Sequence, residues 1–404
     1  MIHESRIRGP HLQGSEVSWF APICGDDYRY LGQAQQEYKS TFYHTREVLL
    51  KAEENGFRNI LCPTSFQVGQ DALAFAAGVA PETSTINLLL AVRCGEYHPP
   101  MLARYIASLD HILRGRLTIN IISSDLPGEN LDSQSRYMRS REVIQILKQA
   151  FMQERIDFQG KFYQLKVPDT SPAKPFQQNG GPMFYFGGYS PYALDLCAEF
   201  CDVYLLWPNK EEILEQQIAK LSSLAWEKYG RKLDYGLRVH VIVRESEREA
   251  KAYAQSLLSK LDLAQGTKIR NRAQDSNSLG VGLQSNLRDT ADVHGYAEDH
   301  LWTGIGLARS GCGAALVGTP DQIIKKINTY QEMGFRSFIF SGYPHAQECD
   351  LFSEYVLPHL KTISLPQAYG RIPEEDPDTP LKEVDLTRIN NAPLDSRSHA
   401  ATEV

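Results

Sequence analysis

What the chain lacks already excludes several classes of protein. No stretch approaches the roughly 20 consecutive apolar residues of a membrane-spanning helix, and the opening residues MIHESRIRGPHLQGSE contain no apolar secretory segment. Basic charge is not in excess, because the formal net charge is -7, so we expect neither nucleic acid nor a membrane as a partner. We therefore expect a cytoplasmic protein that acts on a small molecule.

Cysteine is present, but not in the patterns of metal sites or disulfide frameworks. The 7 cysteines are spread over the whole chain, with no C-x-x-C pair and no His-rich segment beside them. Cys197 and Cys201 lie one helical turn apart, a spacing that suits a metal or a disulfide but also two small buried side chains. We favour the second interpretation, expect reduced thiols, and predict no metal site.

Strand-like and helix-like segments alternate from residue 16 to about residue 341, a pattern typical of repeated βαβ units. No G-x-G-x-x-G follows the first strand, which disfavours the alternative of a doubly wound dinucleotide-binding sheet. A closed parallel barrel uses eight strands, and the sequence therefore predicts a TIM (β/α)8 barrel. The strand candidates are 17–23, 59–63, 86–92, 116–122, 183–188, 203–207, 237–243 and 338–341.

Three segments exceed a minimal barrel, which we expect to occupy residues 1–365. Residues 154–182 read as a short hairpin followed by a proline-rich loop. Residues 263–297 are polar and longer than an ordinary connection, so they are either a candidate active-site lid or a disordered insertion. Residues 366–404 are acidic, proline-rich and poor in large apolar residues, so we expect an extended or disordered C-terminal tail, free or laid as an arm on a neighbouring subunit.

Two strand ends carry the residues best suited to chemistry. Arg238 and His240 lie two apart on a strand, so both side chains point to the same face. A buried guanidinium needs an anionic or multi-acceptor partner, although a structural Arg–carboxylate pair remains an alternative. Tyr343 and His345 follow the last strand, where barrel enzymes hold their catalysts. The grouping predicts a site that binds an anion and handles protons.

Two further residues are candidates for the same site. Arg309, in GLARSGCGAALVG, is a second anion ligand or a solvated charge at a helix end. Trp207 ends the strand VYLLW and is either an apolar wall beside a bound ring or a core residue. Arg309 lies just past the candidate lid, and for both residues the two interpretations stay open at this point.

A second group of residues predicts a phosphate site. A Gly-Gly-x-Ser turn opens a helix, where free backbone N–H groups and the helix dipole favour an anion, although such glycines also serve turn geometry alone. Tyr137 adds a phenolic hydroxyl, and Asn120 can face inward to bond the edge of a heteroaromatic ring. One phosphate and one flat ring describe a mononucleotide such as FMN. The turn consists of Gly187, Gly188, Tyr189 and Ser190.

Taken together, these residues resemble the bacterial-luciferase-like flavin monooxygenases, and within them the alkanesulfonate monooxygenase branch. The likeness runs over most of residues 17–362. It begins with WFAPICGDDYRYLG and SLDHILRGRLTIN and continues in family order with FGGYS and DVYLLW. The segments RVHVIVRE, LWTGIGLARSGCGAALVG and FIFSGYPH are specific for the sulfonate branch.

The resemblance implies a barrel that binds FMNH2 from a separate NAD(P)H-dependent flavin reductase and uses O2 to oxygenate the carbon bearing a sulfonate, giving an aldehyde and sulfite. It also implies a homodimer or homotetramer. The resemblance implies that the sulfonate and oxygen-transfer pocket contains Arg238, His240, Arg309, Tyr343, Trp207 and, with a weaker match, His345. It places on the flavin and its phosphate the residues Asn120, Ser123, Tyr137, Gly188 and Ser190.

The chain also departs from the family pattern around the expected pocket. Cys24 stands where sulfonate enzymes often have His, and Val68 or Gly69 where they have Cys. Residues 96–98, Glu-Tyr-His, add polar groups that suit a hydroxylated sulfonate such as a sulfo-sugar. The alternatives are a related flavin monooxygenase acting on a sulfone or a nitrogen heterocycle, and a non-catalytic flavin-binding barrel.

Overall fold

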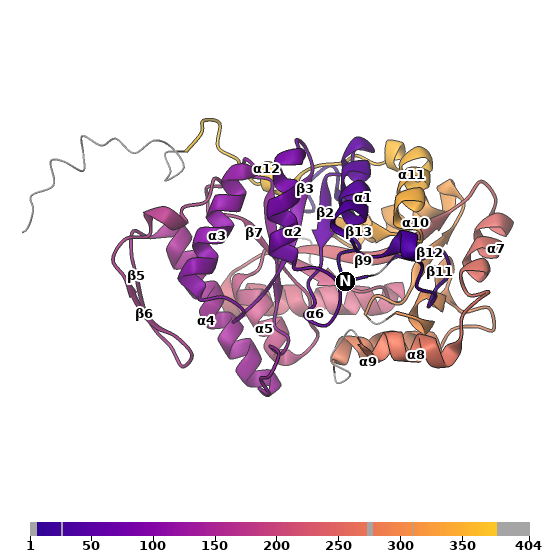
Figure 1. Ribbon diagram of the computed structural model, residues 1–404, viewed down its shortest axis with the longest axis horizontal. Coiled ribbons are helices and arrows are strands. Elements are labelled where there is room, and N and C mark those ends of the chain that lie inside the picture. Colours follow the sequence, from indigo (N-terminus) through magenta and orange to yellow (C-terminus); the bar gives the residue numbers. More distant parts are fainter. Residues whose placement is uncertain (1–5, 26, 273–277, 310, 378–404) are drawn as a thin grey trace, which may run out of the picture.

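Eight parallel strands close into a barrel with helices around its outside (Figure 1). This computed structural model describes residues 6–25, 27–272, 278–309 and 311–377. Each barrel strand coincides with one of the segments expected from the sequence, so the predicted TIM barrel is confirmed. In order around the barrel the strands are β1 (Glu16–Phe20), β2 (Asn59–Cys62), β3 (Asn87–Arg93), β4 (Leu117–Ile122), β7 (Met183–Phe186), β8 (Val203–Leu206), β9 (Asp234–Val243) and β13 (Phe335–Ser341).

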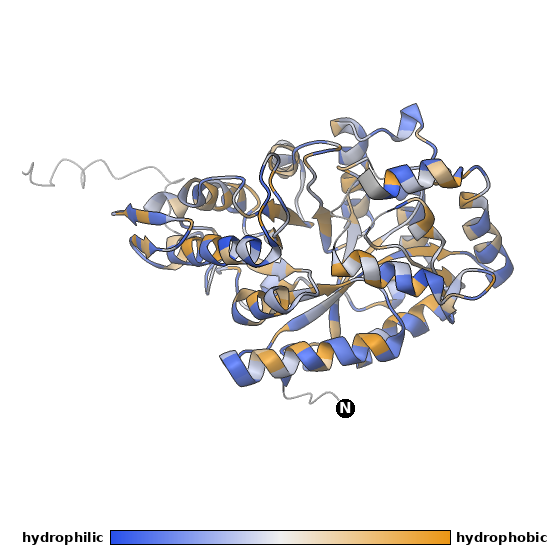
Figure 2. Cartoon of the chain, turned by 90° about the horizontal axis from the view of Figure 1, so that it is seen from below, coloured by the Kyte–Doolittle hydropathy of each residue, from blue (hydrophilic) through white to orange (hydrophobic). Residues whose placement is uncertain are grey.

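The helices between the strands form where apolar residues recur at helical spacing and capping residues stand at their ends. In α10, for example, the Thr319 hydroxyl accepts from the Gln322 backbone N–H while the Gln322 side chain accepts from the Thr319 N–H. Figure 2 shows hydrophobic residues along the central strands and a mixture of both kinds on the helices. These helices are α1 (Phe42–Glu54), α2 (Ala72–Val79), α3 (Pro99–Ile112), α4 (Ser133–Met152), α5 (Pro191–Phe200), α6 (Glu211–Tyr229), α7 (Glu247–Leu257), α10 (Pro320–Glu332) and α11 (His345–Tyr355).

The sheet forks at β9. The first half of this strand of 10 residues pairs with β8, and its second half pairs along the same edge with β12 (Ala315–Gly318), in the register Ala315 to His240. The antiparallel strands β11 (Leu301–Trp302) and β10 (Tyr296–Glu298) continue outward from β12. The sequence did not predict these three strands. β10 and β11, of 3 and 2 residues, are too short to show a periodicity, and β12 directly follows a glycine-rich run. The fork gives β9 a paired strand on at least one edge along its whole length.

The N-terminal end of the barrel is closed by a buried carboxyl group. Glu16 is fully buried and accepts hydrogen bonds from the Tyr185 hydroxyl at 2.6 Å, the Asn59 amide at 3.0 Å and the Leu365 backbone N–H at 3.2 Å. Burial raises the pKa of Glu16, and these hydrogen bonds oppose the rise. Leu365 opens α12 (Leu365–Ala368), which covers this end.

The three predicted additions to the barrel have different outcomes. Residues 154–182 contain the expected hairpin, β5 (Ile156–Gln159) with β6 (Gln164–Val167), which projects from the barrel in Figure 1. Within residues 263–297, the described part is largely helical, in α8 (Leu263–Arg272) and α9 (Leu279–Asp289). The buried positions of these helices are mostly small or polar, with Gly266 on α8 and Gly280, Gln284 and Leu287 on α9, so they form helices despite the polar composition.

The packed body extends beyond residue 365, where the sequence placed its end. The Tyr369 hydroxyl donates to Asp234 at 3.0 Å, and the Arg371 guanidinium pairs with Asp202 at 3.2 Å. These contacts hold the first part of the predicted tail on the barrel, while residues 378–404 lie outside the described residues. Within the described ranges, no helix is long and apolar enough to span a membrane.

Arg8 is the residue whose loss should most weaken this end of the fold. Its guanidinium pairs with Asp234 at 2.7 Å and with Asp202 at 3.0 Å, and both carboxylates are buried. Arg8→Ala would leave the buried Asp234 without its cationic partner, while Asp202 would keep Arg371, so we expect the free energy of unfolding to fall by about 3 to 5 kcal/mol. Urea unfolding at neutral pH measures this decrease in the free energy of unfolding.

The matched control is Arg6→Ala. Arg6 pairs with Glu227, whose side chain is 65% exposed, and such pairs contribute about 0 to 1 kcal/mol. Equal losses in the two variants would contradict the role assigned to Arg8.

Candidate active site

Arg238 and His240 lie side by side on β9 and are joined through β13. Both are buried, and the pairing of β9 with β13 sets His240 opposite Ser341. The Ser341 hydroxyl lies 2.8 Å from an Arg238 guanidinium nitrogen and 2.7 Å from Nδ1 of His240. Arg238 also donates to the Ile339 carbonyl at 3.4 Å. The sequence selected Arg238 and His240, but not Ser341, which reads as an ordinary strand end.

A phenyl ring holds two guanidinium groups at the C-terminal end of the barrel. The guanidinium carbon of Arg238 lies 4.5 Å from the centroid of the Phe20 ring, and that of Arg309 lies 5.3 Å from it. A ring face attracts cations, so it compensates part of what burying them costs. The two arginines come from distant segments and meet at the Phe20 ring. Sequence reasoning missed Phe20, although its inward alternation with Ser18 at the end of β1 was a usable signal.

Tyr343 stands between two histidines. Its ring stacks on His240 with centroids 5.2 Å apart and meets the His345 ring edge-on at 5.2 Å. Tyr343 and His345 are both buried, at the start of α11. The three groups predicted to share a site, Arg238, His240 and Tyr343, are therefore together.

A carboxylate supports His345 from the loop after β1. Asp27 Oδ1 accepts from the backbone N–H of His345 and from its Nδ1, both at 3.0 Å, and Oδ2 lies 2.7 Å from Nε2 of His44 on α1. Burial opposes ionisation of Asp27, but His345, through its charge when protonated and through its hydrogen bonds, and the hydrogen bond of His44 lower the pKa of Asp27 to about 2. Asp27 is thus a carboxylate. Neither Asp27 nor His44 was selected from the sequence. Asp27 lies within the segment WFAPICGDDYRYLG, but its partner His345 is distant in the chain.

His240 is kept neutral by its surroundings. Burial, followed by the positive charges of Arg238 and Arg309 and by the nearby His345, lowers the pKa of His240 well below its ordinary value. A neutral imidazole has one N–H donor and one acceptor nitrogen. The arrangement suits hydrogen bonding to an anion rather than addition of another positive charge.

The residues predicted to hold a flavin lie at the ends of β4 and β7. Asn120 Oδ1 and Ser123 Oγ are buried atoms with no hydrogen-bond partner among the described residues, so they are available to the edge of a ring. A Cβ atom on Gly188 would lie 3.3 Å from the Tyr137 hydroxyl and 2.9 Å from Ala193 on α5. Because glycine lacks that atom, space remains for an anion at the N-terminus of α5. Ser190 caps this helix by accepting from the Ala193 N–H.

Tyr189, also predicted to bind the cofactor, reaches the neighbouring strand instead. Its hydroxyl accepts from the Trp207 backbone N–H at 2.8 Å, and the two rings lie 6.3 Å apart. Gly280 of α9 packs against both rings. The Gln284 side chain of α9 donates to the Pro208 carbonyl at 2.7 Å and accepts from the Gly313 N–H at 3.0 Å. The described part of the candidate lid therefore lies over Trp207 and bridges the end of β8 to the segment before β12.

Gly69, one of the departures from the family pattern, has a steric reason. Gly69 has a φ of 83°, and a Cβ atom there would lie 2.0 Å from the Ile23 carbonyl oxygen. No side chain fits at this position, so it contributes only backbone to the site. The polar residues 96–98 follow β3 and are exposed.

Comparison with known proteins places the whole barrel in one family. The model of the luciferase-like monooxygenase family matches residues 15–337. The chain belongs to the luciferase-like monooxygenase family. It is therefore a monooxygenase, an oxidoreductase, by family, and the predicted resemblance is confirmed.

Two curated proteins show how similar this luciferase-like monooxygenase is to known members. The sulfoquinovose monooxygenase of Agrobacterium fabrum is 56% identical over 375 residues, which cover 93% of this chain and 97% of that protein. The sulfoquinovose monooxygenase of Novosphingobium aromaticivorans is 49% identical over 356 residues, covering 86% and 97%. Among solved structures, the EDTA monooxygenase of a Chelativorans species matches with a TM-score of 0.65 at 14% identity, covering 91% of this chain and 96% of that one.

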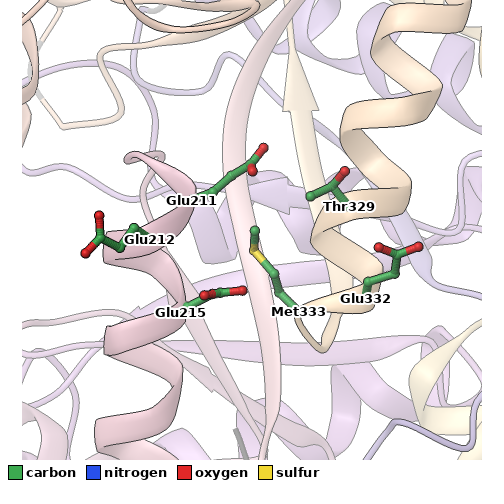
Figure 3. A pocket seen from close by; sticks show the side chains of 6 residues that line it. All are labelled: Glu211, Glu212, Glu215, Thr329, Glu332 and Met333. Carbon is green, nitrogen blue, oxygen red and sulfur yellow. The ribbon is translucent and has the colours of Figure 1, made fainter. Parts of the chain in front are cut away.

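A separate cleft lies on the outside of the barrel of this luciferase-like monooxygenase. It has a volume of about 350 Å³, lies between α6 and α10 (Figure 3), and contains none of the residues predicted for the active site. The cleft is lined by Glu211, Glu212, Glu215, Thr329, Glu332 and Met333.

Within the described ranges, no three His, Cys, Asp or Glu side chains are grouped so that they could hold a metal ion.

The neutrality of His240 predicts a specific dependence of stability on pH. Below a pH of about 6.5, the ordinary pKa of histidine, the unfolded chain binds a proton that the buried ring does not. His240 therefore reduces stability as the pH falls, whereas above that pH neither state protonates it. We expect the free energy of unfolding of His240→Gln to decline less than that of the wild type between pH 7 and pH 5, as measured by urea unfolding.

His359→Gln, at an exposed position, is the matched control and should parallel the wild type. An equal decline in His240→Gln would show that His240 is protonated in the folded protein.

Proposed function

We propose that the protein is a two-component monooxygenase that uses FMNH2 and O2 to desulfonate a sugar sulfonate such as sulfoquinovose, giving an aldehyde and sulfite. In balance, R–CH2–SO3⁻, FMNH2 and O2 give R–CHO, HSO3⁻, FMN and H2O. The observation that carries the proposal is the convergence of Arg238 and Arg309 on the Phe20 ring beside His240. The names of the two relatives support the choice of substrate.

A sulfonate matches the groups at this end of the barrel. Its three equivalent oxygens accept hydrogen bonds in several directions, as the planar forks of Arg238 and Arg309 require. The N–H of neutral His240 adds a donor without adding charge. Because these groups are held by β9, β13 and the Phe20 ring, they need little reorganisation when the anion binds.

The residues at the ends of β4 and β7 fit a flavin mononucleotide. Asn120 and Ser123 would hold the edge of the ring, while Tyr137, Gly188 and the N-terminus of α5 at Ser190 would hold the phosphate. Bound reduced flavin supplies the electrons with which O2 is activated. Trp207, under α9, would shield the reacting carbon from water. The chain has no dinucleotide-binding fingerprint, so NAD(P)H would act on a separate reductase.

The remaining polar groups favour a hydroxylated substrate. Glu96, Tyr97 and His98 follow β3 at the same end of the barrel and offer donors and acceptors to sugar hydroxyls. A plain alkyl chain would leave those groups without substrate partners. We therefore propose a sugar sulfonate, rather than an alkyl or aryl sulfonate, as the preferred substrate.

A sulfite-release screen across sugar, alkyl and aryl sulfonates tests the proposed function. With FMN, a generic flavin reductase, NADH and O2, the wild type should release sulfite, and fastest from sulfoquinovose. Arg238→Ala should retain less than about 1% of kcat/KM, because removing a buried charged hydrogen-bond partner of the substrate costs several kcal/mol.

Arg104→Ala, on the outer helix α3, is the matched arginine control and should resemble the wild type. Sulfite formation without reduced flavin would contradict the proposed chemistry. Tight binding of FMN with no oxygen consumption on any sulfonate would indicate a non-catalytic flavin-binding barrel.

Tyr137→Phe tests the proposed phosphate site apart from turnover. It removes one hydroxyl, and losing a hydrogen bond to a charged group corresponds to about 1.5 to 3 kcal/mol. We expect the Kd for FMN to rise at least about tenfold, as measured by quenching of flavin fluorescence, while the Kd for riboflavin, which has no phosphate, changes little. An equal rise in Kd for FMN and for riboflavin would show that the Tyr137 hydroxyl does not contact the phosphate.

A further inference from the structure

Ser341 determines which nitrogen of His240 carries the proton. The Arg238 guanidinium only donates hydrogen bonds, so the Ser341 oxygen, 2.8 Å away, accepts from it. The single hydroxyl proton of Ser341 then points to Nδ1 of His240 at 2.7 Å. Nδ1 is therefore the acceptor, and a neutral His240 carries its proton on Nε2.

Asp27 imposes the opposite arrangement on His345. The carboxylate only accepts, so Nδ1 of His345, 3.0 Å from Oδ1, carries the proton that it donates. Nε2 of a neutral His345 is then left with a lone pair. The backbone N–H of His345 donates to the same oxygen at 3.0 Å and fixes the carboxylate in place.

Both Nε2 atoms remain available for a substrate. Each belongs to a side chain that is only 1% exposed, and neither has a hydrogen-bond partner among the described residues. The Tyr343 ring separates the two imidazoles, with its centroid 5.2 Å from each, so that they do not bond one another. A buried polar atom without a partner is unfavourable, which favours a ligand that supplies one.

We propose that Ser341 and Asp27 are positioning residues that give the two imidazoles opposite hydrogen-bonding polarity, with His240 a donor to the sulfonate and His345 an acceptor from a substrate hydroxyl. The assignment of ligand groups rests on the proposed function, whereas the assignment of protons does not. A sugar sulfonate presents both kinds of group, an acceptor at its anionic end and donors along its ring. Two acceptors would leave the nitrogen beside the sulfonate unmatched, because a sulfonate accepts hydrogen bonds and has none to donate.

The protons can be observed directly, without turnover. Long-range ¹H–¹⁵N correlation spectra of the ¹⁵N-labelled wild type at pH 8 distinguish the two neutral tautomers of histidine. His240→Gln, His345→Gln and His44→Gln assign the signals. We expect His240 protonated on Nε2, His345 on Nδ1 and His44 on Nε2. Protonation of His240 on Nδ1, or of His345 on Nε2, would overturn the proposal whatever the activity.

Asp27→Asn makes the proton pattern a sharper test. The His345 backbone N–H still requires an oxygen, so the amide would keep its oxygen toward His345 and turn its NH2 toward His44. We expect His345 to retain its tautomer while His44 changes to the form protonated on Nδ1. A change at His345 with none at His44 would contradict the geometry.

Kinetics then connect the proton pattern to the substrate. Ser341→Ala should lower kcat/KM for sulfoquinovose at least about tenfold, and Ser341→Thr, which restores the hydroxyl, should recover it to within about threefold. A loss in both variants, or in neither, would contradict the role of the hydroxyl. If the wild type releases no sulfite from any sulfonate, the proposed function fails while the proton pattern still stands or falls on the spectra.

Discussion

The buried positive charge at the C-terminal end of the barrel is the constraint on which the site depends. Two guanidinium groups share the face of Phe20, and one of them is also bonded to Ser341. Burial and then their charge lower the pKa of His240, and the Ser341 hydroxyl determines which nitrogen of the neutral ring accepts. Phe20 belongs to β1, Arg238 to β9 and Ser341 to β13, so only a closed barrel brings them together.

The N-terminal end of the barrel contributes to stability, and the C-terminal end contributes to function. At the N-terminal end, Glu16 has hydrogen bonds to both carboxyl oxygens, and Arg8 and Arg371 pair with Asp234 and Asp202. At the C-terminal end, several buried polar atoms, including Nε2 of His240, have no partner among the described residues. A satisfied network stabilises a fold, whereas unsatisfied groups are retained where a ligand completes them.

Long elements were predictable from the sequence, and short or cooperative ones were not. The eight barrel strands and the capped helix α10 follow from apolar periodicity and from capping residues within one segment. The strands β10 and β11 are too short for that test, β12 directly follows a glycine-rich run, and the polar composition of residues 263–297 hid two helices. Asp27 and Ser341 were missed because their roles arise from partners more than 100 residues away in the chain.

By itself, the sequence determined the barrel, the inward positions of Arg238 and His240 and their likeness to a monooxygenase family, because strand alternation and local motifs need no long-range information. The tertiary structure alone decided which side chains meet. It placed Arg309 on the Phe20 ring, set Tyr343 between the two histidines and attached Asp27 to His345. Hydrogen-bond polarity depends on such pairs, since a histidine has no fixed tautomer until its neighbours supply a donor or an acceptor.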